Sequence, residues 1–294
     1  MTGEIQVKTP RIGFVTSADH RNLIADDLVL ASALKKHGAT VVPIVWTETS
    51  PQSTRCNLLL LRSCWDYHLR PQAFLNWVNE ANQRTPVVNA PEIVRWNMDK
   101  RYLADLERHR FAVPHTIALK SGSNANLAKL VESHGFSAAV VKPAISLSAY
   151  ETYLVPAREA KQFQPKLDAL LSARDMLVQE FIPQIASEGE WSLIFLGGTF
   201  SHAVRKFPQA GDFRVQHEYG GSVQSVNPSE AMVRTAATIL ERFAPQGVYC
   251  RADLVPRAND FALMELELID PVLHFEFARE AAQRMAELLL HHQP

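Results

Sequence analysis

The stretch Tyr249–Pro271, YCRADLVPRANDFALMELELIDP, contains two extended runs on either side of a turn. The joining segment, PRAND, has the Pro, Asn and Asp that turns favour. Alternate side chains of a strand share a face, so Glu265 and Glu267 project together. A register that pairs Asp253 with an odd-numbered residue adds a third carboxylate to that face. Three clustered carboxylates predict a Mg²⁺ site shared with substrate phosphates, and the alternative is an ordinary half-buried hairpin with solvated acids.

The chain has 294 residues, which exceeds the usual size of one compact core and predicts two or three packed subdomains. The formal net charge is -1 and there is no polybasic run, which argues against nucleic acid or an anionic membrane as a partner. No apolar run approaches the roughly 18 residues that span a bilayer, and MTGEIQVKTP does not have the pattern of a signal peptide. We therefore expect a cytoplasmic protein. Cys56, Cys64 and Cys250 are scattered, which predicts neither a disulfide framework nor a zinc site.

The first third of the chain alternates extended runs with helical periodicity, which predicts an open, largely parallel α/β sheet. The expected strands cover 11–17, 41–46, 57–62 and 86–89. No G-x-G-x-x-G follows the first strand, so a dinucleotide is not expected there. Arg62 ends the apolar run NLLLLR, where open α/β sheets bind ligands, and the alternative is a surface cation at a strand end.

The remaining chain contains two further blocks with strand runs flanked by helices, which is typical of α+β units. In the middle block we expect helices over 99–109, 124–134 and 158–173 and strands over 113–119, 138–142 and 151–155. In the last block we expect strands over 176–182, 191–196 and 199–206, a helix over 229–242, the acidic hairpin and a helix over 275–290. Lys142 ends a very apolar strand, where a lysine either reaches solvent or binds a phosphate.

Six segments, in order, resemble the ATP-grasp ligases, and within them the branch that contains glutathione synthetase and the ribosomal-protein glutamate ligase. They are VNAPEIVRWNMDK, AVVKP, QEFI, FPQAGDFR, RAD and ELELIDP. No single segment is specific, but their shared order and spacing are. The resemblance implies an α/β and α+β chain with the ATP-grasp fold. Its parts would be an N-terminal open parallel α/β substrate domain (1–98), a central lid subdomain (99–175) and a C-terminal α+β subdomain for nucleotide and metal (176–294).

The resemblance also implies a role for each matching residue. The residues that bind ATP would be Lys100, Lys142, Ser146, Gln179, Glu180, Phe181, Ile182 and Glu188. The residues that hold the transferred phosphoryl and acyl groups would be Lys206 and Arg214. The residues that hold Mg²⁺, with two ions expected, would be Asp253, Glu265 and Glu267. The residues that contact the substrate would be Arg62, Gln216, Gly220 and Gly221, with Trp65 and Tyr67 as candidate walls of its pocket.

Two features depart from the family's pattern. Glu267 stands where Asn is more common, which adds charge but keeps an oxygen ligand. The loop after Lys142 lacks the glycines that usually cover the triphosphate and has Ser146 and Ser148 instead. The segments LRSCWDY, GDFRVQ and ELEL further resemble a subgroup that includes the cycloserine-forming ligase of antibiotic pathways. That closer resemblance implies a small amino acid derivative that closes on itself into a ring.

The implied reaction transfers the γ-phosphoryl group of ATP to a small-molecule carboxylate, and an amine-type nucleophile then attacks the acyl phosphate with release of ADP and phosphate. The segment 115–175 is expected to close as a lid over the nucleotide. Dimers are common among related ligases, so a homodimer is compatible with the resemblance. Two other readings stay open: a non-catalytic, nucleotide-binding regulatory protein with the same fold, and a sugar-binding α/β module of the periplasmic type.

Overall fold

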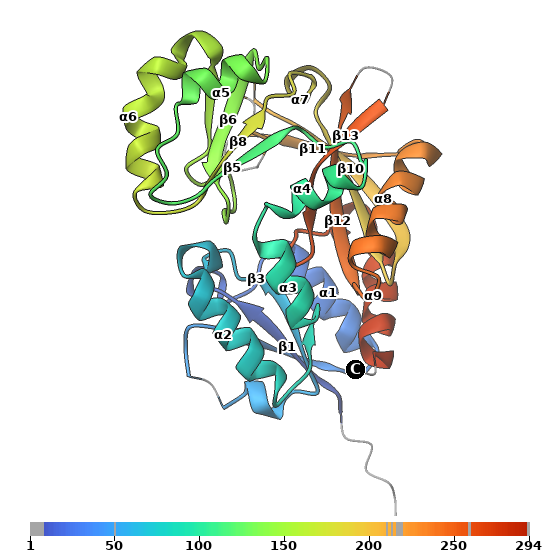
Figure 1. The fold of residues 1–294 in the computed structure, drawn as a ribbon. Coiled ribbons are helices and arrows are strands. Elements are labelled where there is room, and N and C mark those ends of the chain that lie inside the picture. The colour runs from blue at the N-terminus through green and yellow to red at the C-terminus, as the bar shows by residue number, and fades with distance from the viewer. Residues whose placement is uncertain are drawn as a thin grey trace, which may run out of the picture.

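The protein is described from a computed structural model that covers residues 9–49, 51–209, 211–212, 214–215, 220–257 and 260–292. Three separate sheets organise these residues. The first sheet lies at the bottom of Figure 1, the middle sheet at the upper left, and the last sheet at the right. Within the described residues, no helix has the length and apolar character needed to cross a membrane.

The first sheet is fully parallel and has the strand order β2-β1-β3-β4. Its strands are β1 (Arg11–Thr16), β2 (Thr40–Val45), β3 (Leu58–Ser63) and β4 (Val87–Val88). Its helices are α1 (Ala25–Lys36), α2 (Pro71–Asn82) and α3 (Pro91–Met98). All six residues of β3 are buried, as expected for a parallel strand that is covered on both faces. The predicted parallel sheet is confirmed, whereas α3, which begins on a proline, was not predicted.

The middle sheet is antiparallel and has the strand order β5-β8-β6-β7. Its strands are β5 (Thr116–Leu119), β6 (Ala138–Pro143), β7 (Tyr153–Pro156) and β8 (Met176–Glu180). With α5 (Leu127–Ser133) and α6 (Ala160–Leu171) it encloses its own apolar core. The predicted boundary at residue 176 assigned β8 to the last subdomain. The structure places β8 between β5 and β6, a pairing that the periodicity of one strand cannot reveal.

The last sheet is antiparallel and has the strand order β11-β10-β9-β12-β13. Its strands are β9 (Glu190–Leu196), β10 (Thr199–Phe207), β11 (Ser222–Val226), β12 (Tyr249–Arg257) and β13 (Asp260–Glu267). The associated helices are α4 (Tyr102–Arg108), α7 (Gln184–Glu188) and α8 (Glu230–Phe243). The core of this sheet includes Tyr102, Leu103 and Leu106 of α4, so part of the predicted middle block packs with the last sheet.

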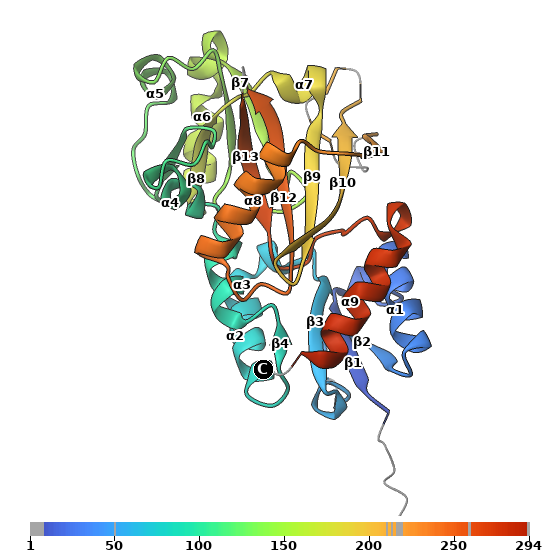
Figure 2. The ribbon, with the colours of Figure 1, turned by 90° about the vertical axis from the view of Figure 1, so that its right-hand side faces the viewer.

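The C-terminal helix α9 (Arg279–His291) packs against α1 and completes the core of the first sheet. Figure 2 shows the two helices side by side on that sheet. Five small or apolar residues of α9 are buried there: Ala281, Ala282, Met285, Ala286 and Leu289. The chain therefore returns to its N-terminal part after building the last sheet, and the segment between β13 and α9 runs across the junction of the two parts.

Short 3₁₀ helices occur in several connections. They are η1 (Ala18–His20), η2 (Ser53–Arg55), η3 (Tyr67–Leu69), η4 (Ala157–Glu159) and η6 (Phe275–Phe277). Buried polar contacts join the first and last sheets. The Asn89 side-chain amide donates to the carbonyl oxygens of Tyr249 at 3.0 Å and Leu268 at 2.7 Å, and its oxygen accepts from the Val248 N–H at 2.7 Å. These contacts fix the acidic hairpin relative to the N-terminal domain.

Candidate active site

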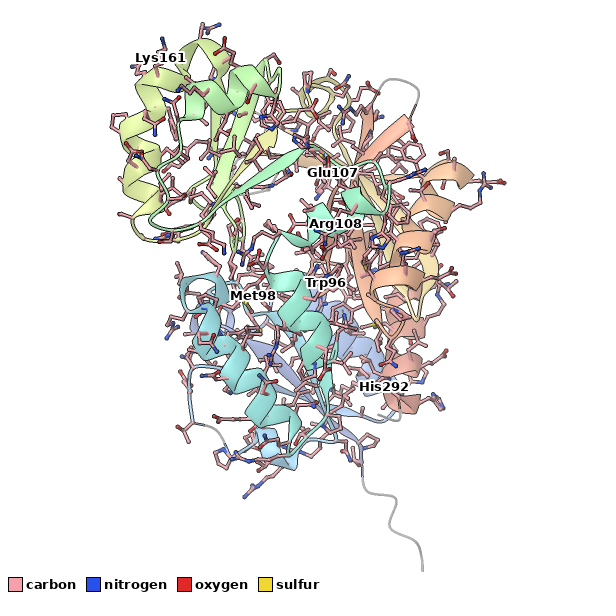
Figure 3. All side chains as sticks on the ribbon, in the orientation of Figure 1. Trp96, Met98, Glu107, Arg108, Lys161 and His292 are labelled. Carbon is pink, nitrogen blue, oxygen red and sulfur yellow. The ribbon has the colours of Figure 1, made fainter. Side chains whose placement is uncertain are left out.

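One cavity of about 730 Å³ is lined by residues of the middle and last sheets and by residues of α1 and the segment after β3. The helix α3 fixes the segment that leads into it. Figure 3 shows Trp96 and Met98 on this helix, between the first and last parts of the molecule. Trp96 stacks on Phe243 of α8 with ring centroids 5.8 Å apart, while Met98 is buried in the core of the first sheet. Lys100, two residues after Met98, therefore enters the cavity from a rigid support.

The acidic hairpin forms part of the cavity wall. Its register pairs Asp253 with Glu265 and Arg251 with Glu267, which confirms the odd-numbered pairing predicted from the sequence. All four side chains line the cavity, and Leu266, between the two glutamates, is buried in the core on the opposite face. The alternation of β13 thus separates Leu266 from the two glutamates as expected, whereas Met264, beside a register shift in the hairpin, lines the cavity as well.

Asp253 lies at the centre of a buried ionic network. It accepts hydrogen bonds from Ser192 Oγ at 2.5 Å and from Arg251 Nη2 at 3.0 Å, and Lys206 Nζ lies 3.4 Å from its carboxylate. Burial would raise the pKa of Asp253, but Arg251 and Lys206 more than offset burial and hold this pKa well below its usual range. Asp253 is therefore ionised at neutral pH.

The pKa of Glu267, in contrast to that of Asp253, is raised. Burial raises its pKa to about 7, and the carboxylates of Glu265 and Asp253 add to the rise although Arg251 opposes it. Glu267 forms an ion pair with Arg251, and Glu265 forms one with Lys100. A group whose pKa is raised by neighbouring carboxylates is stabilised in its ionised form by any further cation that enters the site.

The predicted metal ligands are thus brought onto one wall, and each is neutralised by a side chain of the protein. Among the described residues, no three His, Cys, Asp or Glu side chains form a preassembled metal site. Mg²⁺ needs no such cage, because it is usually held by one or two carboxylates together with waters and substrate phosphates. The oxygen donors of Asp253, Glu265 and Glu267 fit that ion, and their assignment as its ligands stays a prediction.

Three lysines line the same cavity. Lys142 Nζ donates to Gln179 Oε1 at 2.9 Å, and its pKa is lowered to about 8, first by burial and then by the charge of Lys100. Lys206 Nζ lies 2.5 Å from Glu190 Oε1 and is buried. Burial would lower the pKa of Lys206, but Asp253 and Glu190 raise it overall. Lys206 is therefore fully charged, whereas Lys142 is held close to its point of deprotonation.

The segment that follows β8 forms a largely apolar wall. Four residues at the end of β8 and directly after it that were predicted to bind ATP all line the cavity, namely Gln179, Glu180, Phe181 and Ile182. Ile182 packs with Ile185 and Val215, and Met264 of β13 covers the same cluster. The Glu180 carboxylate instead accepts two hydrogen bonds from Arg257 Nη2, at 3.0 and 3.1 Å. An apolar wall of this kind suits the ring of a nucleobase.

The loop after Lys142 is ordered without glycine. Ser146 is buried and lines the cavity, as predicted. Ser148, Ala149 and Glu151 adopt left-handed conformations, with φ of 47°, 54° and 47°, which non-glycine residues rarely adopt. Tyr150, between them, contacts the ring of His68 with centroids 4.9 Å apart. This contact with the N-terminal domain holds the three residues in left-handed conformations, which glycine adopts more readily than other residues do.

Arg62 does not line the cavity, so its predicted role as the anchor of the substrate carboxylate is wrong. Its side chain is 1% exposed and bridges two acids of α1. Nε donates to Asp27 Oδ1 at 2.6 Å and Nη2 donates to Asp26 Oδ2 at 3.0 Å. The sequence showed a cation at the end of a strand, but it could not show that α1 brings two carboxylates onto it.

Other predicted residues lie away from the cavity. Glu188 is exposed at the end of α7, and the acid that lines the cavity is Glu190 at the start of β9. Gly220 and Gly221 precede β11 and are not part of the described wall. Gln216 lies outside the described residues. Tyr67 is buried against Phe74 instead of facing the cavity. Lys206, Arg214 and Trp65 do line it.

Sequence reasoning assigned no role to several residues of the wall, namely Asp26, Glu190, Arg251, His274 and Glu276. The alternation of side chains between the two faces of a strand could have identified two of these residues. Arg251 shares a strand face with Asp253, and Glu190 shares one with Ser192, which donates to Asp253. The others come from α1 and from the segment between β13 and α9, whose proximity depends on the packing of α9 against α1.

Comparison with known proteins identifies the family and the fold. A family model described as the RimK-like ATP-grasp domain matches residues 99–285. A second, for the N-terminal domain of D-cycloserine synthetase DcsG, matches residues 12–89. The cycloserine biosynthesis protein DcsG of Streptomyces lavendulae is 27% identical over 301 residues, which cover 95% of this chain and 97% of that protein. A glutathione synthetase of Prochlorococcus marinus is 23% identical over 166 residues, 55% of this chain and 51% of its own length.

Solved structures share the whole fold. The crystal structure of D-cycloserine synthetase DcsG superposes with a TM-score of 0.86 at 25% identity, covering 95% of this chain and 98% of that one. D-alanine–D-alanine ligase from Bacillus anthracis in complex with ATP has a TM-score of 0.69 at 15% identity, with 96% of each chain covered. The predicted ATP-grasp fold and the resemblance to its ligases are thereby confirmed. Members of this family use ATP and Mg²⁺. The chain belongs to the RimK-like ATP-grasp family of ATP-dependent, ADP-forming carbon–nitrogen ligases.

Proposed function

We propose that the protein activates a small amino-acid-like carboxylate as an acyl phosphate. The carboxylate oxygen attacks the γ-phosphorus of ATP, and the bond to the β-phosphate oxygen breaks with release of ADP. An amine nitrogen then attacks the acyl carbon, phosphate leaves, and the nitrogen loses a proton to form an amide. The observation that supports this most is the gathering of Lys100, Lys142 and Lys206 with the hairpin carboxylates around one cavity. Phosphoryl transfer depends mainly on such positioning and charge neutralisation.

The cationic residues would have separate roles. Lys100 and Lys142 hold the nucleotide phosphates as point charges. Lys206 and Arg214 stabilise the charge that develops on the transferred phosphoryl group and the acyl oxygen. Lys206 is well suited to this role, because its two carboxylate partners keep it charged and fixed in place. Because Glu190 lines the cavity and Glu188 does not, Glu190 rather than Glu188 is proposed as the acid that contacts the nucleotide.

Asp253, Glu265 and Glu267 are proposed as the residues that hold Mg²⁺, with two ions in the loaded enzyme. The ions would neutralise charge on the phosphate oxygens. For this the carboxylates must exchange part of their present pairing with Arg251 and Lys100 for contacts with the cation. The arginine and lysine would then be released to contact substrate oxygens. This exchange explains why each predicted ligand is neutralised by a protein cation.

The nucleophile can belong to the same molecule as the carboxylate. The relatives named for cycloserine formation support this version, since a cycloserine ring is closed by an amide bond. Opening that bond gives 2-amino-3-(aminooxy)propanoate, known as O-aminoserine, which carries the carboxylate and the nucleophilic nitrogen together. We propose O-amino-D-serine as the first substrate to test. The middle sheet and the loop at 144–152 would close over the nucleotide and exclude water from the acyl phosphate.

The test is hydroxamate formation with ATP, Mg²⁺ and hydroxylamine, across a panel of amino acids that includes O-amino-D-serine. Hydroxylamine intercepts an acyl phosphate whatever the natural nucleophile is. A hydroxamate from one panel member with an equal amount of ADP is the expected result. ADP with a cyclic product and little hydroxamate would also support the proposal, in its ring-closing version. Neither ADP nor hydroxamate from any member of the panel would contradict it.

A further inference from the structure

The carboxylates on the cavity wall are paired with lysine or arginine, with one exception among the described residues. Seven acids of the described part of the chain line the cavity, and the six that have such a partner are Asp26, Glu180, Glu190, Asp253, Glu265 and Glu267. The seventh is Glu276, whose ionic partner is the imidazole of His274, 3.3 Å from Nδ1 to Oε1. The wall therefore has one carboxylate to which the described part of the chain supplies no permanent cation.

Glu276 is also accessible to a ligand. Its side chain is 52% exposed, whereas that of His274 is 9% exposed. Partial burial would raise the pKa of Glu276, but the hydrogen bond with His274 and the charges of nearby histidines lower it. The carboxylate is consequently ionised at neutral pH and open to the cavity.

The backbone that carries Glu276 is held firmly. Asp26 accepts the N–H of Leu273 at 2.8 Å and the N–H of Phe275 at 2.7 Å. His202 Nε2 lies 2.8 Å from the carbonyl oxygen of Leu273. Phe275 is buried in the core of the first sheet. Glu276, the next residue, is thus presented from a fixed 3₁₀ turn, which is the kind of support that a recognition residue needs.

The residues around Glu276 differ from those of the apolar wall after β8, which suits a nucleobase. The helix α1 contacts the turn that carries Glu276 and contributes Val29 to the wall, and the segment after β3 contributes Trp65 to the same cavity. Trp65 is fixed by two contacts. Its indole N–H donates to the carbonyl oxygen of Asp270 at 3.2 Å, and its ring packs edge-on against the ring of His20 with centroids 4.7 Å apart. A cavity wall that combines an acid without a lysine or arginine partner, a tryptophan and apolar side chains favours an organic ammonium group over a phosphate or a carboxylate.

We propose that Glu276 binds the ammonium group of the substrate and thereby selects carboxylates that carry a free amino group. The inference rests on the proposed function, since it assigns the recognition residue of that same site. The substrate carboxylate would face Lys206 and Arg251, while its ammonium group forms a charge-assisted hydrogen bond with Glu276. His274 is a positioning residue that orients the Glu276 carboxylate. A deaminated acid would leave Glu276 without a cation and would bind more weakly.

The experiment compares two acids that differ only in the amino group. The first is the amino acid that the hydroxamate panel identifies, and the second is the same acid without its α-amino group; for O-amino-D-serine the second is 3-(aminooxy)propanoate. ADP release is measured for the wild type, Glu276→Gln, Glu276→Asp and Glu280→Gln. Glu280, in the first turn of α9, is exposed and outside the described wall, so its substitution changes the same charge without touching the cavity.

We expect Glu276→Gln to lower kcat/KM for the amino acid by about 10-fold to 100-fold, mainly through KM, because it removes a hydrogen bond between charged groups. The deaminated acid should react equally with the wild type and Glu276→Gln. Glu276→Asp should keep part of the preference, and Glu280→Gln should keep all of it. The dissociation constant of ATP, measured by calorimetry, should not change in any variant.

Several results would overturn the assignment. A parallel loss for both acids would mean that Glu276 supports the fold or the nucleotide. An unchanged preference would mean that another group binds the amine. A loss in kcat with KM unchanged would assign Glu276 to proton transfer instead of binding. If the wild type acts on no member of the panel, the proposed function fails, and the assignment of Glu276 fails with it.

Discussion

The carboxylate of Asp26 accepts a hydrogen bond of 2.7 Å from the backbone N–H of Phe275, 249 positions later in the chain. The same carboxylate accepts from Arg62 Nη2 at 3.0 Å, and all three groups are buried. This contact joins the start of α1 to the segment that precedes α9. One acid therefore ties the N-terminal domain to the part of the cavity wall that carries His274 and Glu276.

We expect Asp26→Asn to destabilise the protein by about 3–5 kcal/mol, because it leaves Arg62 buried with one carboxylate fewer. Urea denaturation measures this as a lower midpoint at an unchanged slope. The matched control is Asp19→Asn in η1, which removes one acid from the same region of the sequence outside this network. A loss below about 1 kcal/mol would show that Arg62 is satisfied by Asp27 alone.

The lowered pKa of Lys142 predicts that ATP binding weakens in alkaline solution. Burial and the charge of Lys100 lower this pKa to about 8, so Lys142 loses its charge as the pH rises through that value. We expect the dissociation constant of ATP, measured by calorimetry, to rise between about pH 7 and about pH 9. Lys142→Arg keeps its charge over this range and should remove most of the rise. The same pH dependence in both proteins would contradict a phosphate contact at Lys142.

The raised pKa of Glu267 predicts that Mg²⁺ stabilises the protein more at higher pH. Glu267 holds its proton more tightly in the folded protein, with a pKa of about 7. Its contribution to metal-free stability is therefore present below about pH 4.5 and is lost as the pH rises through about 7, a change of up to about 3 kcal/mol. A cation binds the ionised form, so the rise in Tm with Mg²⁺ should be larger at about pH 7.5 than at about pH 5.5. Equal rises at the two pH values, or the same pattern in Glu267→Gln, would exclude Glu267 as the group responsible.

Substitutions at Lys206 and Glu190 should have coupled effects on the free energy of unfolding. Lys206→Met leaves Glu190 buried without its cation, so we expect a loss of about 3–5 kcal/mol in the free energy of unfolding. Adding Glu190→Gln should recover part of this loss, because the second substitution removes the uncompensated charge. Urea denaturation of both single variants and the double variant gives the coupling energy. Simple additivity of the two losses would show that the ion pair makes no net contribution.

Gly189 is the glycine whose replacement should disturb the site most directly. Its φ is +70° and a Cβ atom there would lie 2.4 Å from the carbonyl oxygen of Lys206. We expect Gly189→Ala to cost at least about 2 kcal/mol more than Gly198→Ala, where φ is +74° but the space around a Cβ is open. Thermal unfolding compares the two variants, which both place alanine at a positive φ; at Gly189 the extended ψ of −177° adds to the clash. Equal losses would show that the contact with Lys206 is relieved by a small shift.

Local patterns in the sequence predicted the strands well, because alternation reports which side chains share a face. It placed Glu265 and Glu267 together, and the register then paired Asp253 with Glu265 as expected. The order of the ATP-grasp motifs likewise identified Lys100, Lys142 and Lys206, all of which line the cavity. Alternation does not report which strand lies alongside, so β8 was assigned to the wrong sheet.

The misassigned site residues have a common cause. Arg62 and Glu188 were chosen from their positions relative to a strand or motif, and position along the chain does not determine the direction or the partner of a long side chain. Arg62 is held by α1, and Glu188 is exposed on α7 two residues before the acid that does enter the cavity. The loop after Lys142 was uncertain for a similar reason. Its left-handed residues are held by contacts with the N-terminal domain, including Tyr150 on His68.

The sequence by itself determined the family, the acidic hairpin and the lysines, because these depend on the type, order and alternation of residues along short segments. Only the tertiary structure decided which charges meet. The packing of α9 against α1 brings Glu276 to the cavity, and the packing of α1 beside β3 pairs Arg62 with Asp26 and Asp27. Ionic pairing in a buried site depends on distances of a few ångströms between distant segments, and folding sets those distances.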